Sequence, residues 1–207
     1  MFKYEGKTLE EALAKIAVEK NCEIEDITYN ILEEKNGMFG LGNKVVIEAY
    51  VISDVSKFIV EYLKKFFADL EINIEVGIAL EDNTFKVNLN ADNNAILIGK
   101  NGTTLRAINN VVRAATNATF RRRFYLLVDI NNYKIERYEK LKAIAKREAS
   151  KVKKTKIDVL LDPMPNDERK VVHQVLQEFD NIKTLSEGEG FRRRLRISYT
   201  DSKEENS

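Results

Sequence analysis

The sequence predicts an α+β protein made of three small domains that follow one another along the chain. Segments with helical periodicity alternate with short runs in which apolar and polar residues alternate. The chain has 207 residues, of which 43% are hydrophobic and 32% charged, a composition typical of one to three small globular units and unlike that of a disordered chain. A Gly-x-x-Gly turn near the middle separates acidic from basic sequence.

The net charge of +1 conceals a strong asymmetry along the chain. Residues 1–53 and residues 54–98 each carry a net charge of −4, residues 99–153 carry +10, and residues 154–207 carry −1. The basic block begins at the Gly-x-x-Gly turn. Positive charge concentrated in one part of a nearly neutral chain indicates a site for a polyanion, although a solvated helix face explains part of it.

Several classes of protein are disfavoured by the composition. No apolar run approaches the roughly 20 residues that span a bilayer, and no secretory leader opens the sequence. The single Cys22 fits a reducing, cytoplasmic setting. Without a Cys/His cluster we expect no structural zinc site, and we expect no cofactor.

The first 52 residues predict a small β-α-β-β unit. Thr8, with Glu11 three residues later, forms a capping-box start to an amphipathic helix. The predicted strands cover residues 2–4, 27–32 and 45–51. The apolar residues of the glycine-rich loop at 36–42 pack locally in the favoured interpretation, with a partner contact as the alternative. Ser53 and Asp54 are the only indication of a linker.

Residues 55–130 predict the order helix, strand, strand, helix, turn, helix, strand. Ile72, Ile74, Val76 and Ile78 alternate with polar residues, Asp82-Asn83 turns the chain, and Phe85, Val87 and Leu89 continue the hairpin. A short helix ends at Ile98, a longer one reaches about Asn117, and a third strand covers residues 124–130.

The turn itself favours contact with a sugar-phosphate backbone. Gly99 and Gly102 permit a close approach, Lys100 supplies charge, and Asn101 offers hydrogen bonds. A polar face of the following helix is predicted from the spacing of Arg106, Asn110, Arg113 and Asn117. Ile96 and Ile98 are read as core residues, with walls of a base groove as the alternative. The run of three arginines at 121–123 is either solvated or binds a nucleic-acid backbone.

This order of elements around a Gly-x-x-Gly turn resembles a KH domain of type II over the whole of residues 55–131. The resemblance implies binding of single-stranded nucleic acid, with about four nucleotides clamped over the turn. It assigns Gly99, Lys100, Asn101 and Gly102 to that contact, together with Arg106 and Arg113 on the next helix.

Residues 133–200 predict a third domain, with a long basic helix from Tyr133, a strand at 157–161, a second helix and a closing hairpin at 182–185 and 191–199. Asn166 or Asp167 is expected to cap the second helix, and Arg192, Arg194 and Arg196 to share a strand face. Arg169 and His173 lie four residues apart on one helix face. With the Pro-Met turn before them and a Thr-x-Ser-x-Gly segment after them, they resemble an Arg-x-x-x-His domain. Arg169 then offers a fork to phosphate, and His173 donates or stacks; the alternative for His173 is a structural surface histidine.

The combination of the three domains, at residues 1–52, 55–131 and 133–200 with a disordered tail at 201–207, resembles the Jag (KhpB, EloR) family of bacterial RNA-binding proteins. This resemblance implies a regulator or RNA chaperone linked to cell elongation, the envelope or sporulation. It also implies a small KH-domain partner and association with a YidC-type membrane insertase, which would bring the cytoplasmic protein to the inner face of the membrane. Many relatives have a long acidic linker after the first domain, and here only Ser53-Asp54 intervenes.

The sequence therefore leaves three functions open. The leading one is a non-catalytic binder of single-stranded RNA or single-stranded DNA. The second is a protein–protein adaptor for which RNA binding is incidental. The third is a nuclease with His173 as general base, which is disfavoured because the sequence shows neither a metal-binding carboxylate cluster nor a second acid/base group.

Overall fold

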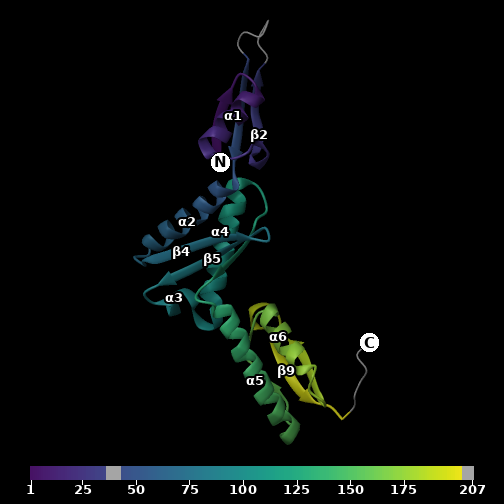
Figure 1. Ribbon diagram of the computed structural model, residues 1–207. Helices are drawn as coiled ribbons and strands as arrows, with labels where there is room; N and C mark the ends of the chain where they lie inside the picture. Colours follow the sequence, from purple (N-terminus) through teal and green to yellow (C-terminus); the bar gives the residue numbers. More distant parts are fainter. Residues whose placement is uncertain (36–42, 202–207) are drawn as a thin grey trace. The chain divides into compact units, whose positions relative to one another are not determined.

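The computed structural model describes residues 1–35 and 43–201, in two compact units, Met1–Asn131 and Asn132–Ser207 (Figure 1). The glycine-rich loop at 36–42 and residues 202–207 of the predicted tail lie outside the described residues. Each unit is built from helices packed on a three-stranded sheet, and the first unit holds two such sheets. This arrangement confirms the predicted α+β class.

The first domain has the predicted β-α-β-β order and forms an antiparallel sheet with strand order β1-β3-β2. Its elements are β1 (Phe2–Gly6), α1 (Leu9–Lys20), a 3-10 turn (Ile24–Asp26), β2 (Thr28–Lys35) and β3 (Lys44–Tyr50). Ala12 and Ile16 of α1 pack on Ile47 and Ala49 of β3, and all four are completely buried.

The start of α1 is fixed by side chains and by one glycine. Thr8 Oγ1 accepts a hydrogen bond from the Glu11 amide at 3.2 Å, and Glu11 Oε2 accepts one from the Lys7 amide at 3.0 Å. The predicted capping box is therefore confirmed, with Lys7 as the second donor. A Cβ atom at Gly6 would lie 2.8 Å from the backbone of Ala12 and Thr8, so only glycine fits between β1 and α1.

The predicted linker at Ser53-Asp54 is wrong, because both residues lie in the first turn of α2 (Ile52–Ala68). Asp54 Oδ2 accepts a hydrogen bond from the Val51 amide at 3.0 Å, and Oδ1 accepts one from Lys20 Nζ at 2.8 Å. The Asp54 side chain is 7% exposed. Its hydrogen bond with Lys20 raises the pKa of Lys20. A residue that resembles a linker thus caps α2 and ties it to α1.

Aromatic packing completes the junction between the first two domains. The Tyr50 ring, at the end of β3, lies edge-on 4.9 Å from Phe120 and 6.3 Å from Phe124, measured between centroids. Tyr50 is 3% exposed. The last strand of the first domain therefore contributes to the core of the second.

The second domain has the element order predicted for a type II KH domain. Its elements are α2, β4 (Ile74–Glu81), β5 (Thr84–Ala91), α3 (Asn94–Ile98), a 3-10 turn (Lys100–Gly102), α4 (Thr103–Phe120) and β6 (Tyr125–Asp129). The sheet order is β4-β5-β6, with β4 antiparallel and β6 parallel to β5. The predicted alternation is confirmed, since Phe85, Val87 and Leu89 are at most 1% exposed while the residues between them face solvent.

The second unit is an antiparallel sheet of order β7-β9-β8 with two helices. Its elements are α5 (Tyr133–Thr155), β7 (Val159–Leu160), α6 (Asn166–Leu176), β8 (Ile182–Glu187), a 3-10 turn (Gly190–Arg192) and β9 (Arg194–Tyr199). Two details differ from the sequence prediction. Pro165, without a side-chain cap, precedes α6, and Arg192 lies in the 3-10 turn, so only Arg194 and Arg196 share a strand face.

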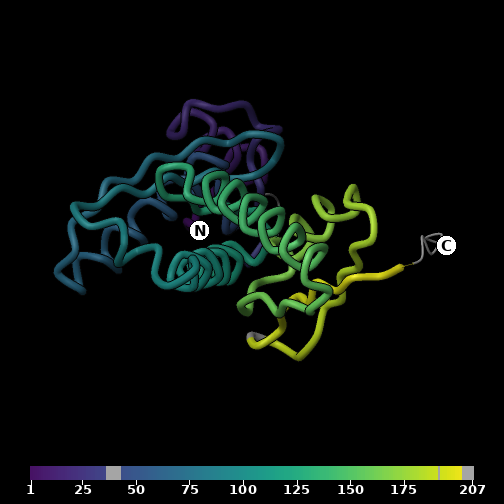
Figure 2. The backbone as a smooth tube through the Cα atoms, turned by 90° about the horizontal axis from the view of Figure 1, so that it is seen from below, coloured from purple at the N-terminus to yellow at the C-terminus, as the bar shows by residue number. Residues whose placement is uncertain are grey.

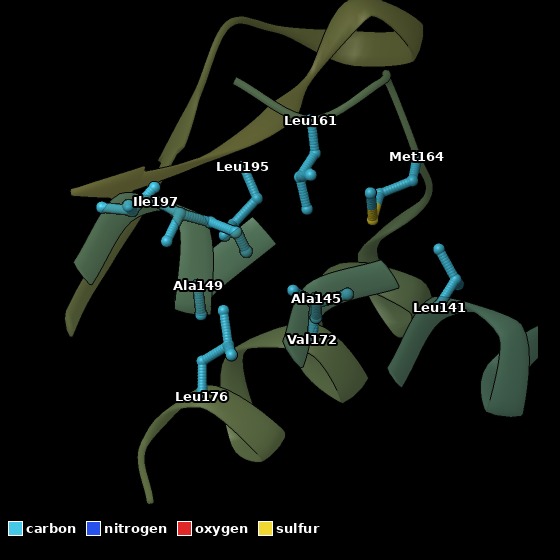
Figure 3. Close-up of a cluster of buried hydrophobic side chains, with 10 residues drawn as sticks. Leu141, Ala145, Ala149, Leu161, Met164, Val172, Leu176, Leu195 and Ile197 are labelled. Carbon is cyan, nitrogen blue, oxygen red and sulfur yellow. The ribbon is translucent and has the colours of Figure 1, made fainter. Parts of the chain in front are cut away.

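The core of this unit joins both helices to the sheet. Figure 2 shows α5 as a long helix. In Figure 3, Ala145 and Ala149 of α5 lie beside Val172 and Leu176 of α6. Leu195 and Ile197 of β9 lie above them. The alanines allow the two helices to approach closely, and the cluster buries most of the apolar face of each. Among the described residues, no helix is long and apolar enough to cross a bilayer.

The Lys20–Asp54 pair predicts a pH-dependent stability. We expect Lys20→Met to destabilise the protein by about 2 kcal/mol at neutral pH, because Asp54 loses a charged hydrogen-bond partner. Since the folded-state pKa of Lys20 is raised, this contribution is complete below about pH 10 and disappears as the pH rises through the folded-state value. Urea unfolding at several pH values measures it.

The control is Lys57→Met, which removes the exposed Lys57–Glu61 pair and should change stability by less than about 0.5 kcal/mol. A Lys20→Met protein as stable as the unsubstituted chain at pH 7 would contradict the role given to this pair.

Candidate nucleic-acid interface

The Gly-x-x-Gly turn has a backbone conformation that requires glycine at its first position. Gly99 has φ 68° and ψ 179°, a region that residues with a side chain avoid, and Asn101 and Gly102 also have positive φ, at 52° and 71°. A Cβ atom at Gly99 would lie 2.1 Å from Thr104 Oγ1. The turn therefore brings the backbone of Gly99 directly against Thr104 at the start of α4.

Lys100 and Asn101 form the tip of this turn, as predicted. Lys100 is exposed, and its carbonyl accepts a hydrogen bond from Thr103 Oγ1 at 2.9 Å. Asn101 is half-buried. The ammonium group of Lys100 is thus available to an anion, while the backbone beneath it is held by the first residue of α4.

The two arginines predicted on α4 differ in their surroundings. Arg106 is half-buried and donates from Nη1 to the Asn101 carbonyl at 3.0 Å, so it stabilises the backbone of the turn. Arg113 is exposed and donates from Nη2 to Asn110 Oδ1 at 3.0 Å. Arg113 therefore keeps the solvent-facing position that a phosphate contact needs, whereas Arg106 has a structural bond in addition.

Asparagine side chains on the same helix bind the backbone of β6 instead of facing solvent. Asn117 Oδ1 accepts from the Phe124 amide at 2.8 Å, and Asn109 Oδ1 accepts from the Val128 amide at 2.9 Å. The two asparagines are eight residues apart and satisfy one amide just before β6 and one amide within it. Asn117, predicted on the polar face of α4, is thus engaged by a backbone amide, and Asn109 was missed because the spacing does not reveal its partner.

The two isoleucines of α3 also differ from the expected pattern. Ile96 is 56% exposed and Ile98 is half-buried, while Leu97 between them is 1% exposed and belongs to the core. The core prediction is wrong for Ile96. Its side chain lines an apolar cavity of about 230 Å³ bounded by α2, α3 and α4, whose wall includes Phe66, Leu70 and Val111.

The arginine run at 121–123 is exposed, as predicted, and each side chain has a neighbour. Arg121 lies 3.4 Å from Glu48, Arg122 lies 5.9 Å from the Phe124 ring, and Arg123 lies 5.7 Å from the Tyr125 ring. The distances of Arg122 and Arg123 from the rings are those of weak cation–π contacts, which leave both of these guanidinium groups accessible.

In the second unit Arg169 is buried and holds the turn before its own helix. It is 7% exposed and donates from Nη1 to the Met164 carbonyl at 2.8 Å and from Nη2 to Asn166 Oδ1 at 3.0 Å. Burial and the nearby Arg193 lower its pKa. Both ends of the predicted fork are thus occupied by the protein, and in this conformation Arg169 positions the Pro-Met turn.

His173 is exposed and lies between two polar side chains. Nδ1 is hydrogen-bonded to the Thr184 hydroxyl of β8, and the Gln177 amide lies 3.5 Å from Nε2. These contacts orient the ring toward the surface between α6 and β8. The structure therefore places His173 where a ligand can reach it and supplies Thr184, which sequence reasoning noted only as part of the Thr-x-Ser-x-Gly segment.

Arg193 is the cation that the structure adds to this site. Its carbonyl accepts from the Met164 amide at 3.1 Å, so it adjoins the turn that Arg169 holds, and its side chain is exposed. Arg196, by contrast, is paired with Glu187 and Asp158. Within the residues that the structure describes, no group of three or more His, Cys, Asp or Glu side chains is arranged to hold a metal ion.

Comparison with known proteins supports the assignment of the domains. Family models match at residues 4–51 (Jag N-terminus), 56–128 (KhpA/KhpB, KH domain) and 139–199 (R-3-H domain). The fold and its turn thus define a KH protein with an additional Arg-x-x-x-His domain.

Relatives extend this match along most of the chain. An RNA-binding protein KhpB of Clostridium symbiosum is 32% identical over 188 residues, covering 89% of this chain and 85% of the relative. That of Bacillus subtilis is 30% identical over 200 residues, covering 94% and 96%. One from Streptococcus pneumoniae is 27% identical over 158 residues, covering 75% and 47%. The chain belongs to the KhpB family.

The geometry at Gly99 predicts the effect of a single methyl group. We expect Gly99→Ala to cost about 3 kcal/mol of stability in the first unit, because alanine is strained at this φ and ψ and meets Thr104. The matched control is Gly77→Ala in β4, where the nearest atom to a new Cβ is 3.9 Å away. Chemical unfolding of both variants measures the difference, and equal stability would refute the strain argument.

Arg169 and His173 are expected to differ in what their removal does. Arg169→Met should lower the stability of the second unit by about 3 kcal/mol, because the buried Met164 carbonyl loses a charged donor. His173→Ala should cost about 1 kcal/mol or less, since the ring is exposed. Unfolding followed by NMR signals from residues 133–200 separates the two effects, and an Arg169→Met unit of unchanged stability would show that the bond is not structural.

Proposed function

We propose that this chain binds single-stranded RNA without catalysing a reaction. The observation that carries the proposal is the turn at Gly99–Gly102, where the half-buried Gly99 adjoins the exposed Lys100 at the start of a basic stretch of sequence. A sugar-phosphate backbone fits such a turn because it needs close approach and positive charge together. The names of the KhpB relatives as RNA-binding proteins support the choice of RNA over single-stranded DNA.

The second unit supplies a second site in this proposal. His173 offers its exposed ring to a base or phosphate, Arg193 supplies charge, and Arg169 keeps the turn between them in place. The neighbours of His173 are Thr184 and Gln177, which suit binding better than proton transfer. Two weak sites on one chain increase affinity through a high effective concentration.

The cellular role proposed here follows the family. We propose a cytoplasmic post-transcriptional regulator or RNA chaperone that acts in cell elongation, envelope assembly or sporulation. The support is membership of the KhpB family.

A small KH-domain protein is the proposed partner of the second domain. The apolar cavity bounded by α2, α3 and α4 supports this, since Phe66, Leu70, Ile96 and Val111 around it are 39–56% exposed. Exposed apolar side chains gathered at one place are typical of a protein contact.

An adaptor is the second candidate function. In this reading the first domain and the KH surface bind proteins, among them a YidC-type membrane insertase that would bring the chain to the inner face of the membrane, and RNA is incidental. The acidic charge of residues 1–53 favours a protein partner for that part of the chain. Partners that survive nuclease treatment and vanish when residues 1–52 are removed would support it.

The proposed RNA contact predicts the effect of reversing charge at the tip of the turn. We expect the double variant Lys100→Asp/Asn101→Asp to bind a single-stranded oligoribonucleotide at least tenfold more weakly, because it replaces a phosphate-binding cation by two carboxylates and leaves both glycines in place. Fluorescence anisotropy at two salt concentrations measures affinity, and the salt dependence should also become shallower.

The control is Lys57→Asp, which makes the same lysine-to-aspartate replacement as Lys100→Asp at an exposed position of α2. It should leave the affinity within about twofold, because a single distant charge is screened at physiological ionic strength. Affinity that is unchanged in the double variant, or lowered equally in the control, would overturn the assignment of the turn.

A further inference from the structure

The sheet of the first domain is only partly covered by its helix. Ile47 and Ala49 of β3 are completely buried under α1. Their registered neighbours on β2 are Ile31 and Tyr29, which share that face of the sheet because directly opposite residues point the same way. Yet Ile31 is 47% exposed and Tyr29 38% exposed. Strand β2 therefore presents apolar side chains on the core side that no described element covers.

This exposed surface continues along an open strand edge. The sheet order ends at β2, so one side of the strand has no neighbour among the described strands. Ile24, just before β2, is also 47% exposed. We call the apolar side chains Tyr29 and Ile31 on this face, with the open edge of β2 beside them, the β2 strip. An open edge beside apolar side chains is the geometry to which extended peptides add as a further strand.

The charge around the β2 strip selects its occupant. Glu23, Glu25 and Asp26 precede β2 and Glu34 lies near its end; all four are exposed, and none forms an ion pair within the described residues. Two copies of the strip would bring these carboxylates together, which disfavours self-association, and RNA would be repelled. A positively charged segment is attracted.

We propose that the β2 strip binds an extended segment of a partner protein that alternates lysine or arginine with apolar residues. The segment adds as a fourth strand to the edge of β2, its apolar residues cover Tyr29 and Ile31, and its cations face Glu34 and the carboxylates before the strand. This site is separate from the proposed RNA contacts and does not rest on them.

The test uses the full-length chain and a synthetic nine-residue peptide of alternating lysine and valine. Backbone amide shifts in a nitrogen-15 NMR titration should change at residues 24–34 and stay unchanged at Gly99–Gly102. A peptide of alternating glutamate and valine is the charge control and should not bind. Ile31→Lys should weaken binding of the lysine-valine peptide at least tenfold.

The control variant is Val18→Lys, at a position of α1 that is 84% exposed and outside the strip. Both variants should remain folded in chemical unfolding, because Ile31 is 47% exposed and Val18 is 84% exposed. The proposal is overturned if the lysine-valine peptide does not bind at millimolar concentration, if both peptides bind equally, or if Ile31→Lys binds normally. It is also overturned if the amide shifts at residues 24–34 change with protein concentration alone, because that indicates a second copy as the occupant. A change in the amide shifts of residues 36–42 on Ile31→Lys without peptide would overturn it as well, because it indicates that the chain covers its own strip.

Discussion

The positive φ angles at Gly99, Asn101 and Gly102 are the constraint on which the interface of the first unit depends. They reverse the chain between α3 and α4, whose residues Leu97 and Leu105 are both buried in the same domain. The helices on either side can bury these residues only if the turn keeps its conformation. Stability of the core and the course of the backbone at the proposed RNA contact are thus consequences of one local geometry.

An arginine holds a backbone carbonyl in each of the two candidate sites. Arg106 donates to Asn101 and Arg169 donates to Met164. A guanidinium group has five donors in a rigid plane, so it fixes a turn more firmly than a lysine does. The side chains that face solvent beside these turns are Lys100 in the first unit and His173 in the second. Each candidate site therefore separates the residue that shapes the backbone from the residue that is proposed to meet a ligand.

Most of the fold could be predicted from local pattern, and the error at the boundary of the first two domains concerns a contact between distant residues. The capping box at Thr8 and the alternation at Phe85, Val87 and Leu89 depend on neighbours in sequence, and both are confirmed. Asp54 reads as a linker because its partner Lys20 lies 34 residues earlier. A motif such as Arg-x-x-x-His likewise marks candidate site residues, but their burial decides which of them is accessible. Arg169 is buried and bonded to the Met164 carbonyl, while His173 is exposed.

The junction at Tyr50 and Asp54 places a strict limit on chain length. Tyr50 is committed to the aromatic core, and Asp54 must reach both the Val51 amide and Lys20. One extra residue between Val51 and Asp54 would rotate α2 by about 100° and carry Val55, Ile59 and Leu63 out of the core. The number of residues between β3 and the first turn of α2 is therefore fixed. Sequence can be gained in surface loops, but an insertion at this boundary must bring its own cap for α2.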